Sequence, residues 1–313
     1  MAGRVEAICI SEKKGTEKQP ISKINIIEDH GLENDAHAGK WHRQVSLLPY
    51  EEREAFKARG ADVKDGAFGE NLLISGIDFN QLTVGTHVHI GEVDLEITQR
   101  GKSCHSHCRI YHQVGECIMP RLGLFARVIH GGTIQCQDEV SFSTRTDLRK
   151  RVAVLTLSDK GSKGLRIDES GPYIKEYMEN KGYYVTSLDI LPDDQKQIEQ
   201  MLINLSDRCE NDLILTTGGT GLSIRDVTPE ATLNVATRNV PGIAEALRYE
   251  SMKYTNRAML SRGASVIRHQ TLIINLPGSL KAVKESLDII IEPIEHGLQI
   301  LKGEAHDCAR IDD

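Results

Sequence analysis

The chain has 313 residues, with 38 Lys and Arg against 45 Asp and Glu, and a formal net charge of −7. A net acidic surface has no general attraction for nucleic acid, so any anionic ligand must be held by local groups. No apolar run approaches the roughly 20 residues of a membrane-spanning helix, and no signal-peptide pattern follows Met1. The chain has seven cysteines, an odd number that lacks the spacing of a disulfide framework, as expected for a protein in a reducing compartment. We therefore expect a cytoplasmic protein, with two domains at this length.

Residues 1–145 predict an all-β domain. Strands are expected at 4–10, 44–48, 71–74, 87–90, 93–98, 125–130 and 134–142, with one helix at 50–59 and a polar loop at 29–39. Short strands at regular spacing between turn signals favour a barrel or a sandwich.

Cysteine and histidine gather after the expected strand 93–98. Cys104 follows Arg100 and Lys102, whose positive charges favour the thiolate, the form that acts as a nucleophile or a soft-metal ligand. A structural zinc site is an alternative, although no second close pair completes a zinc-ribbon spacing. The side chains available to it are Cys104, His105, His107, Cys108 and Cys117. For Cys108 and Cys117, a role as small buried side chains is equally open.

Several motifs in this half, in order along the chain, resemble the MOSC domain. They are Gly31-x-x-Asn34-Asp35-x-His37-x-Gly39, Gly66-x-Phe68-Gly69-Glu70-Asn71, Val84-Gly85, Gly91-x-x-x-Leu95-Glu96-x-Thr98 and Cys104. MOSC domains are the β-barrel modules of molybdenum cofactor sulfurases and related molybdenum-handling proteins. The resemblance implies that Cys104 is the thiol that handles cofactor, molybdenum or sulfur. Asn34 and Ser103 depart from the family pattern, which usually has glycine and proline there.

The polar segment 141–150 separates the two halves, and we place the boundary between residues 145 and 146. Residues 146–313 then alternate strand and helix. Strands are expected at 152–157, 184–191, 213–217, 265–267 and 271–276, and helices at 171–181, 194–209, 229–238, 242–256 and 281–301. This alternation predicts a three-layer α/β domain, a doubly wound sheet covered by helices on both faces.

The expected strand 213–217 breaks into Gly218-Gly219-Thr220-Gly221. Glycine adopts positive φ and allows a ligand to approach the backbone, so successive N–H groups can line an anion site. A tight turn is the alternative, and the loop is not a P-loop because no Gly-Lys-Ser/Thr closes it. Asp226 follows at loop distance, and Thr228-Pro229 predicts an N-capped helix.

Polar clusters follow four of the expected strands at their carboxyl ends. They are Ser158-Asp159-Lys160-Gly161, Pro192-Asp193-Asp194, Gly218 to Gly221 with Asp226, and Pro277-Gly278-Ser279. Ligands of open parallel sheets bind at this edge, so we expect the four loops to converge. Taken singly, each cluster has a structural alternative, such as a helix cap at Asp193-Asp194 or a simple turn at Pro277-Gly278-Ser279.

The residue types in these four loops predict a site for phosphoryl or nucleotidyl transfer. Asp193 and Asp226 suit Mg²⁺, which prefers one or two carboxylates together with phosphate oxygens. Lys160, Arg225 and Lys281 could neutralise phosphate charge, although Arg225 is equally read as a solvated surface residue. In such reactions, positioning and charge stabilisation supply most of the catalysis.

The C-terminal half is similar to the MogA/MoaB family of molybdopterin-binding proteins, whose MogA branch are molybdopterin adenylyltransferases. The matching motifs are Ser158-Asp159, Asp168-x-Ser170-Gly171-Pro172, Pro192-Asp193, Thr217 to Gly221, Arg225-Asp226-x-Thr228-Pro229-Glu230-Ala231 and Asn275-Leu276-Pro277-Gly278-Ser279. The resemblance implies transfer of AMP from Mg-ATP to the terminal phosphate of molybdopterin, with release of pyrophosphate. It also implies a homo-oligomer, commonly a trimer.

The same resemblance assigns roles to individual residues. Asp193 and Asp226 become catalytic carboxylates associated with Mg²⁺. The loop that binds the pterin phosphate and the nucleotide is Gly218, Gly219, Thr220 and Gly221, and the pocket is lined by Ser158, Asp159, Pro277, Gly278 and Ser279.

Both halves indicate one pathway, so we expect a bifunctional cofactor-biosynthesis protein. Molybdopterin synthase and a molybdenum-insertion enzyme are its expected partners, with neither nucleic acid nor membrane involved. The alternative is a non-catalytic carrier that holds molybdopterin or the finished cofactor.

Overall fold

The computed structural model describes residues 3–102 and 117–304 and divides the chain into two compact units, Met1–Leu148 and Arg149–Asp313. Cys104, His105, His107 and Cys108 lie outside the described residues. No helix in the described ranges is long and apolar enough to cross a membrane.

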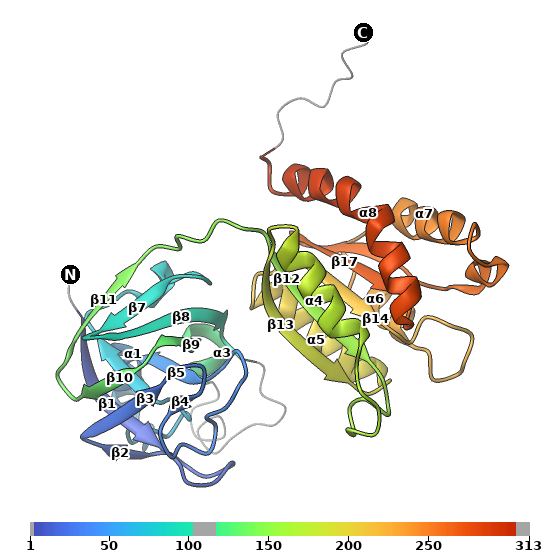
Figure 1. Cartoon of the computed structure of the whole chain (residues 1–313). Helices are drawn as coiled ribbons and strands as arrows, with labels where there is room; N and C mark the ends of the chain where they lie inside the picture. The colour runs from blue at the N-terminus through green and yellow to red at the C-terminus, as the bar shows by residue number, and fades with distance from the viewer. Residues whose placement is uncertain (1–2, 103–116, 305–313) are drawn as a thin grey trace. The chain divides into compact units, whose positions relative to one another are not determined.

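The first unit is built on a closed ring of seven strands (Figure 1). In order around the ring they are β1 (Gly3–Ile10), β11 (Glu139–Ser143), β7 (His87–Ile90), β8 (Val93–Arg100), β9 (Leu124–His130), β5 (Val45–Pro49) and β6 (Leu72–Ser75). The pairing of β11 with β1 closes the ring. Alternate residues such as Leu95 and Ile97 point into one buried apolar cluster, because successive strand residues face opposite sides. The expectation of a β-barrel is confirmed.

Smaller elements surround the ring. They are β2 (Gln19–Ile21), which extends the sheet beside β1, a separate sheet of β10 (Gly132–Gln135), β3 (Lys23–Ile27) and β4 (Gly31–Leu32), the helices α1 (Tyr50–Ala58) and α3 (Met119–Leu122), and the 3-10 turn η1 (Phe79–Gln81). The single strand expected at 134–142 is wrong, since β10 and β11 are separated by a turn with Gln137 at φ +73°. The expected loop 29–39 contains β4.

The second unit is a six-stranded sheet between two layers of helices. The strand order is β13 (Tyr184–Leu191), β12 (Arg151–Leu157), β14 (Leu213–Thr217), β17 (Thr271–Leu276), β16 (Ser265–Arg268) and β15 (Arg238–Asn239). The first four are mutually parallel, and β16 and β15 add antiparallel. Every residue of β12, β14 and β17 is buried, as expected for central strands covered on both faces.

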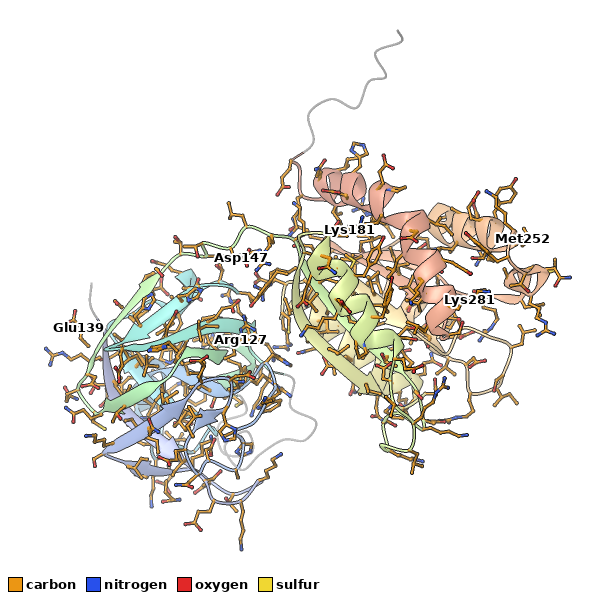
Figure 2. All side chains as sticks on the ribbon, in the orientation of Figure 1. Arg127, Glu139, Asp147, Lys181, Met252 and Lys281 are labelled. Atoms are coloured by element: carbon orange, nitrogen blue, oxygen red, sulfur yellow. The ribbon has the colours of Figure 1, made fainter. Side chains whose placement is uncertain are left out.

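Apolar side chains attach the helices to the two faces of this sheet. Figure 2 shows the described side chains on the ribbon. One face packs against α4 (Ser170–Asn180), α7 (Pro241–Ser251) and α8 (Leu280–Leu301). The other packs against α5 (Gln195–Asp207) and α6 (Thr228–Asn234). The 3-10 segment η2 (Asn256–Leu260) follows α7. The expected three-layer α/β fold is confirmed, and its parallel strands end at one edge.

Candidate functional site

A pocket of about 440 Å³ lies at the carboxyl ends of the parallel strands. We call it the strand-end pocket. Among its lining residues are Ser158, Asp193, Gly218, Gly219, Asp226, Gly278 and Ser279. Residues from the loops after β12, β13, β14 and β17 therefore meet there, as the strand order brings these four ends side by side.

The backbone of the glycine loop leaves no room for side chains at two positions. Gly218 has φ +100° and Gly219 has φ +63°, a region that L side chains rarely adopt. A Cβ at Gly218 would overlap the carbonyl oxygen of Leu157. A Cβ at Gly219 would overlap Thr228 Oγ1 and lie 3.1 Å from Asp193 Oδ1. A carboxylate therefore lies directly against the backbone of the glycine loop.

Asp193 is held by reciprocal hydrogen bonds with Asp159. The Asp159 N–H donates to Asp193 Oδ2 (3.0 Å), and the Asp193 N–H donates to Asp159 Oδ1 (3.1 Å). The next residue, Asp194, is the N-cap of α5 and accepts from the Gln197 N–H at 3.0 Å. The helix-cap interpretation thus applies to Asp194, and Asp193 faces the pocket.

Asp226 lies against the glycine loop at Gly221, two residues beyond the position that Asp193 approaches. Its Oδ2 accepts the Ser223 N–H at 2.9 Å and would lie 2.8 Å from a Cβ at Gly221. Because Gly221 has no side chain, the Asp226 carboxylate can rest against the end of the loop.

Arg225 joins the loops after β12 and β14. Its guanidinium donates to both oxygens of Asp159, at 2.8 to 3.1 Å. These hydrogen bonds hold the pKa of Asp159 below its usual range. Burial raises the pKa of Asp193, and the negative charges of Asp159 and Asp226 act in the same direction. Because the Asp226 carboxylate lies close enough to raise the pKa of Asp193, the two side chains are suited to share a cation.

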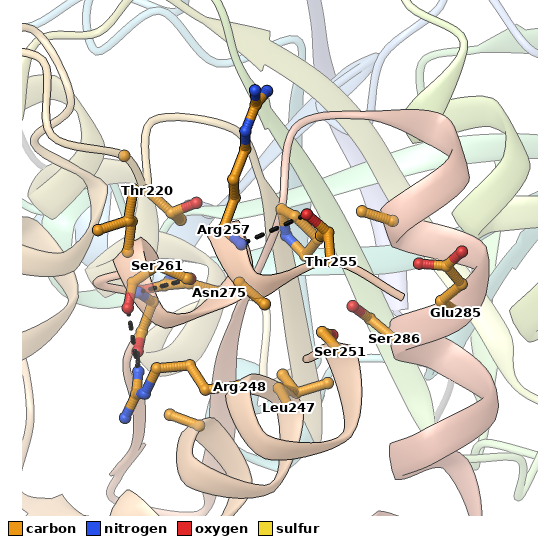
Figure 3. Close-up of a pocket in the computed structure, with 17 residues that line it drawn as sticks. Thr220, Leu247, Arg248, Ser251, Thr255, Arg257, Ser261, Asn275, Glu285 and Ser286 are labelled. Carbon is orange, nitrogen blue, oxygen red and sulfur yellow. Dashed lines mark hydrogen bonds between the residues drawn. The ribbon is translucent and has the colours of Figure 1, made fainter. Parts of the chain in front are cut away.

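Three of the expected site residues line a different pocket. Thr220, Gly221 and Pro277 contribute to a neighbouring cavity of about 290 Å³, which we call the helix-side pocket (Figure 3). Its other walls come from α7, η2 and α8, including Arg248, Ser251, Arg257 and Ser286. Figure 3 shows Arg248 hydrogen-bonded to Ser261, another residue that lines this cavity.

This second pocket is the part of the site that the sequence analysis missed. Its residues are spread from 220 to 286 and belong to no single motif. One signal was present: Ser286 is a polar residue on the apolar face of α8, where it is only 1% exposed.

Other expectations differ from the structure. Thr228 does not cap α6 with its side chain, because its hydroxyl donates to the carbonyl of Gly218 at 3.0 Å and so fastens the glycine loop. Lys160 and Lys281 do not line the strand-end pocket. Its cationic lining residue within the described chain is Arg166.

In the first unit, the polar residues of the MOSC-like motifs form a buried network. Asp35 is 5% exposed and accepts from Lys18 Nζ (2.6 Å), the Ser11 N–H (3.0 Å) and Asn71 Nδ2 (3.1 Å). Burial alone would raise the pKa of Asp35, but these donors lower it. Glu70 is fully buried and accepts from the amides of Gly66 and Phe68. These motif residues hold loops together inside the fold.

Four of the five side chains of the alternative zinc site lie outside the described residues. Cys117 is described and is partly buried. Within 3–102 and 117–304, no group of three His, Cys, Asp or Glu side chains is arranged to hold a metal ion.

Comparisons with known proteins match both halves. Residues 153–296 match the family model described as "Probable molybdopterin binding domain", and residues 34–141 match the MOSC domain. The chain is 40% identical over 156 residues to the molybdopterin adenylyltransferase of Helicobacter pylori, covering 49% of this chain and 88% of that protein. It is 43% identical over 140 residues to the molybdopterin adenylyltransferase of Escherichia coli K12, covering 44% and 72%.

Solved structures match over a similar share of the chain. The molybdopterin biosynthesis enzyme MoaB of Thermus thermophilus is 43% identical, with a TM-score of 0.47 over 49% of this chain and 97% of that one. The tungsten cofactor synthesizing protein MoaB of Pyrococcus furiosus is 33% identical, with a TM-score of 0.45 over 50% and 98%. Given the identity to the bacterial proteins and the share of them that is covered, this chain belongs to the MogA/MoaB family and carries a MOSC domain in its N-terminal half.

Proposed function

We propose that the C-terminal unit is a molybdopterin adenylyltransferase that uses Mg-ATP. The observation that carries this proposal is the placement of the Asp193 and Asp226 carboxylates on the glycine loop, at the mouth where the parallel strands end. The names of the bacterial relatives support the choice of substrate.

Charge balance supports the participation of a divalent cation. The strand-end pocket is lined by Asp168, Glu169, Asp193 and Asp226, with Arg166 as the cation among its described lining residues. A triphosphate that entered alone would meet net negative charge, in spite of the glycine-loop amides. Asp193 and Asp226 each keep one carboxylate oxygen without a protein donor in the described chain, as a metal ligand requires. Mg²⁺ bound there would supply charge neutralisation between the carboxylates and the phosphates.

The protein groups then have separate tasks in the reaction. An oxygen of the terminal molybdopterin phosphate attacks the α-phosphorus of ATP, the bond to the β-phosphate breaks, and pyrophosphate leaves. The amides of the glycine loop orient the phosphates in the strand-end pocket. The helix-side pocket is lined by Thr220 and Gly221, and the strand-end pocket by Gly218 and Gly219 of the same loop; the helix-side pocket provides room for a flat ring system. Two pockets joined at one loop fit two substrates whose phosphates must meet.

The carrier hypothesis shares both pockets but does not require the carboxylates. We expect Asp193→Asn and Asp226→Asn to abolish pyrophosphate release from molybdopterin, Mg²⁺ and labelled ATP, while pterin binding is retained. A carrier would form no adenylated pterin even as wild type. Formation of adenylated pterin by both variants at the wild-type rate would contradict the assignment of the carboxylates.

For the MOSC domain, we propose that Cys104 handles cofactor, molybdenum or sulfur. Fusion raises the effective concentration of a labile dithiolene product near the second module. Substitution of Cys104 by serine should leave pyrophosphate release unchanged and abolish the handling of cofactor, molybdenum or sulfur by the MOSC domain. Metal analysis of the same variant tests the zinc alternative, because a zinc site would lose its metal.

The assembly and its partners are proposed by analogy with the family. We expect a homotrimer in solution, which sedimentation equilibrium would distinguish from a monomer. We also expect molybdopterin synthase to supply the substrate and a molybdenum-insertion enzyme to consume the product.

A further inference from the structure

Arg262 connects both ends of the loop that carries Asp226. It lies between η2 and β16. Its N–H donates to the carbonyl of Thr220 at 2.9 Å, and its Nε donates to the carbonyl of Gly221 at 2.7 Å. The two remaining guanidinium nitrogens reach the carbonyl of Asp226 and the carboxylate of Glu230. One side chain therefore holds the end of the glycine loop, the backbone of Asp226 and the first turn of α6.

The loop from Gly221 to Asp226 has little apolar burial to fix its shape. Leu222 is 67% exposed and Ile224 is 96% exposed. Local hydrogen bonds between Ser223 and Asp226 close the turn but do not attach it to the sheet. Its attachment therefore depends on polar contacts, and Arg262 makes them at both ends of the loop.

We propose that Arg262 is a positioning residue that sets the location of the Asp226 carboxylate relative to Asp193 and Gly219. This inference rests on the proposed adenylyltransferase function. A planar guanidinium can donate to acceptors in several directions at once, whereas a lysine ammonium of similar reach is a point charge without the fixed fork. Arginine is thus required for its shape in addition to its charge.

Arg248, which lines the helix-side pocket, contacts the two residues that flank Arg262. From α7, its Nη1 donates to the carbonyl of Gly263 at 3.0 Å and reaches that of Ser261 at 3.4 Å, on either side of Arg262 (Figure 3). The wall of the helix-side pocket and the Asp226 loop are therefore tied to one short turn. Arg262 therefore connects the Asp226 loop to a turn whose neighbouring residues, Ser261 and Gly263, line the helix-side pocket.

The test compares Arg262→Lys with a matched control, Arg268→Lys. Arg268 on β16 also contacts a carboxylate, Asp207, and a backbone carbonyl, that of Val235, but these partners lie outside the glycine loop and the Asp226 loop. Both variants lose a similar set of contacts, so their thermal stabilities should fall alike. Only Arg262→Lys should shift the Mg²⁺ dependence of pyrophosphate release, by about 10–100-fold, the usual effect of disturbing the support of a metal ligand.

Binding of Mn²⁺ to the full chain, followed by electron paramagnetic resonance, provides a readout that does not need turnover. We expect weaker Mn²⁺ binding in Arg262→Lys and in the reference variant Asp226→Asn, and wild-type binding in Arg268→Lys. An Arg262→Lys protein with wild-type Mg²⁺ dependence and Mn²⁺ affinity would overturn the inference while leaving the proposed function intact. A wild-type protein that neither binds Mn²⁺ nor releases pyrophosphate would overturn the proposed function, and this role of Arg262 with it.

Discussion

Replacing Gly219 by alanine tests how tightly the glycine loop is packed. At φ +63°, alanine adopts a left-handed conformation that costs about 1–2 kcal/mol. Its Cβ would also overlap Thr228 Oγ1 and lie 3.3 Å from Thr228 Cβ, so the Thr228 side chain must rotate. That rotation breaks the hydrogen bond from Thr228 to the carbonyl of Gly218.

Gly164→Ala is the matched control. Gly164 has φ +69° and nothing within 4 Å of an added Cβ, so it carries the same backbone penalty without the overlap. The extra loss in Gly219→Ala is then about 1 kcal/mol for the hydrogen bond and about 1 kcal/mol for the displaced rotamer. We expect Gly219→Ala to be less stable than Gly164→Ala by about 2 kcal/mol, the sum of these two terms.

Urea unfolding of the full chain can resolve this difference. Far-ultraviolet circular dichroism follows the second unit, which contains α4 to α8. Fluorescence of Trp41, the one tryptophan in the sequence, follows the first unit and serves as an internal reference. Equal destabilisation by the two alanine variants would show that the loop relaxes without cost, and the packing described for Gly219 would be refuted.

Three further predictions concern charged groups. The negative charge of Asp226 raises the pKa of Asp193, and the positive charge of Arg225 lowers it. In a pH titration of Mn²⁺ binding, the pH at which Asp193 is protonated and binding is lost should therefore fall in Asp226→Asn and rise in Arg225→Gln. Unchanged pH profiles would argue against this coupling. Burial raises the pKa of Glu70 to about 7 from 4.5, so the folded state takes up a proton and stability falls as pH rises between those values; Glu70→Gln should remove that slope in Trp41-monitored unfolding. Lys18→Met leaves the Asp35 carboxylate buried without its cation, with an expected loss of about 3–5 kcal/mol in the same assay, whereas a loss below about 1 kcal/mol would mean that Ser11 and Asn71 suffice.

Much of the second unit could be predicted from the sequence because its central strands are covered on both faces. Val152 to Leu157 and Leu213 to Thr217 are apolar runs for that reason, and the polar clusters after them mark the strand ends. Parallel pairing then determines that these ends share one edge. The location of the strand-end pocket follows from this topology alone.

Other features depend on partners that no local pattern identifies. Thr228 stands before Pro229 as an N-cap residue would, but the carbonyl of Gly218 lies close enough to take its hydroxyl hydrogen bond. The turn between β10 and β11 was missed because Gln137 occupies a left-handed position that usually belongs to glycine. β2 has only three residues, too few to show the alternation that predicts a strand. β3 does alternate exposed and buried residues, so its sequence could have predicted a strand.

Hydrogen-bond saturation separates the structural carboxylates of this protein from those available for a ligand. Both oxygens of Asp35 are occupied by protein donors. So are both oxygens of Asp168, which accept from Thr156, Ser170 and Gly171 although Asp168 lines the strand-end pocket. Each of these carboxylates has its negative charge stabilised by the fold itself.

Asp193 and Asp226 differ in this respect. Each accepts one backbone N–H on Oδ2, and in the described part of the chain no protein group donates to either Oδ1. A carboxylate that is partly buried, next to a second one and incompletely hydrogen-bonded gains more from a cation than one that is saturated. We therefore propose Asp193 and Asp226 as the carboxylates that bind a divalent cation with the nucleotide, whereas Asp168 accepts backbone N–H groups at the start of α4.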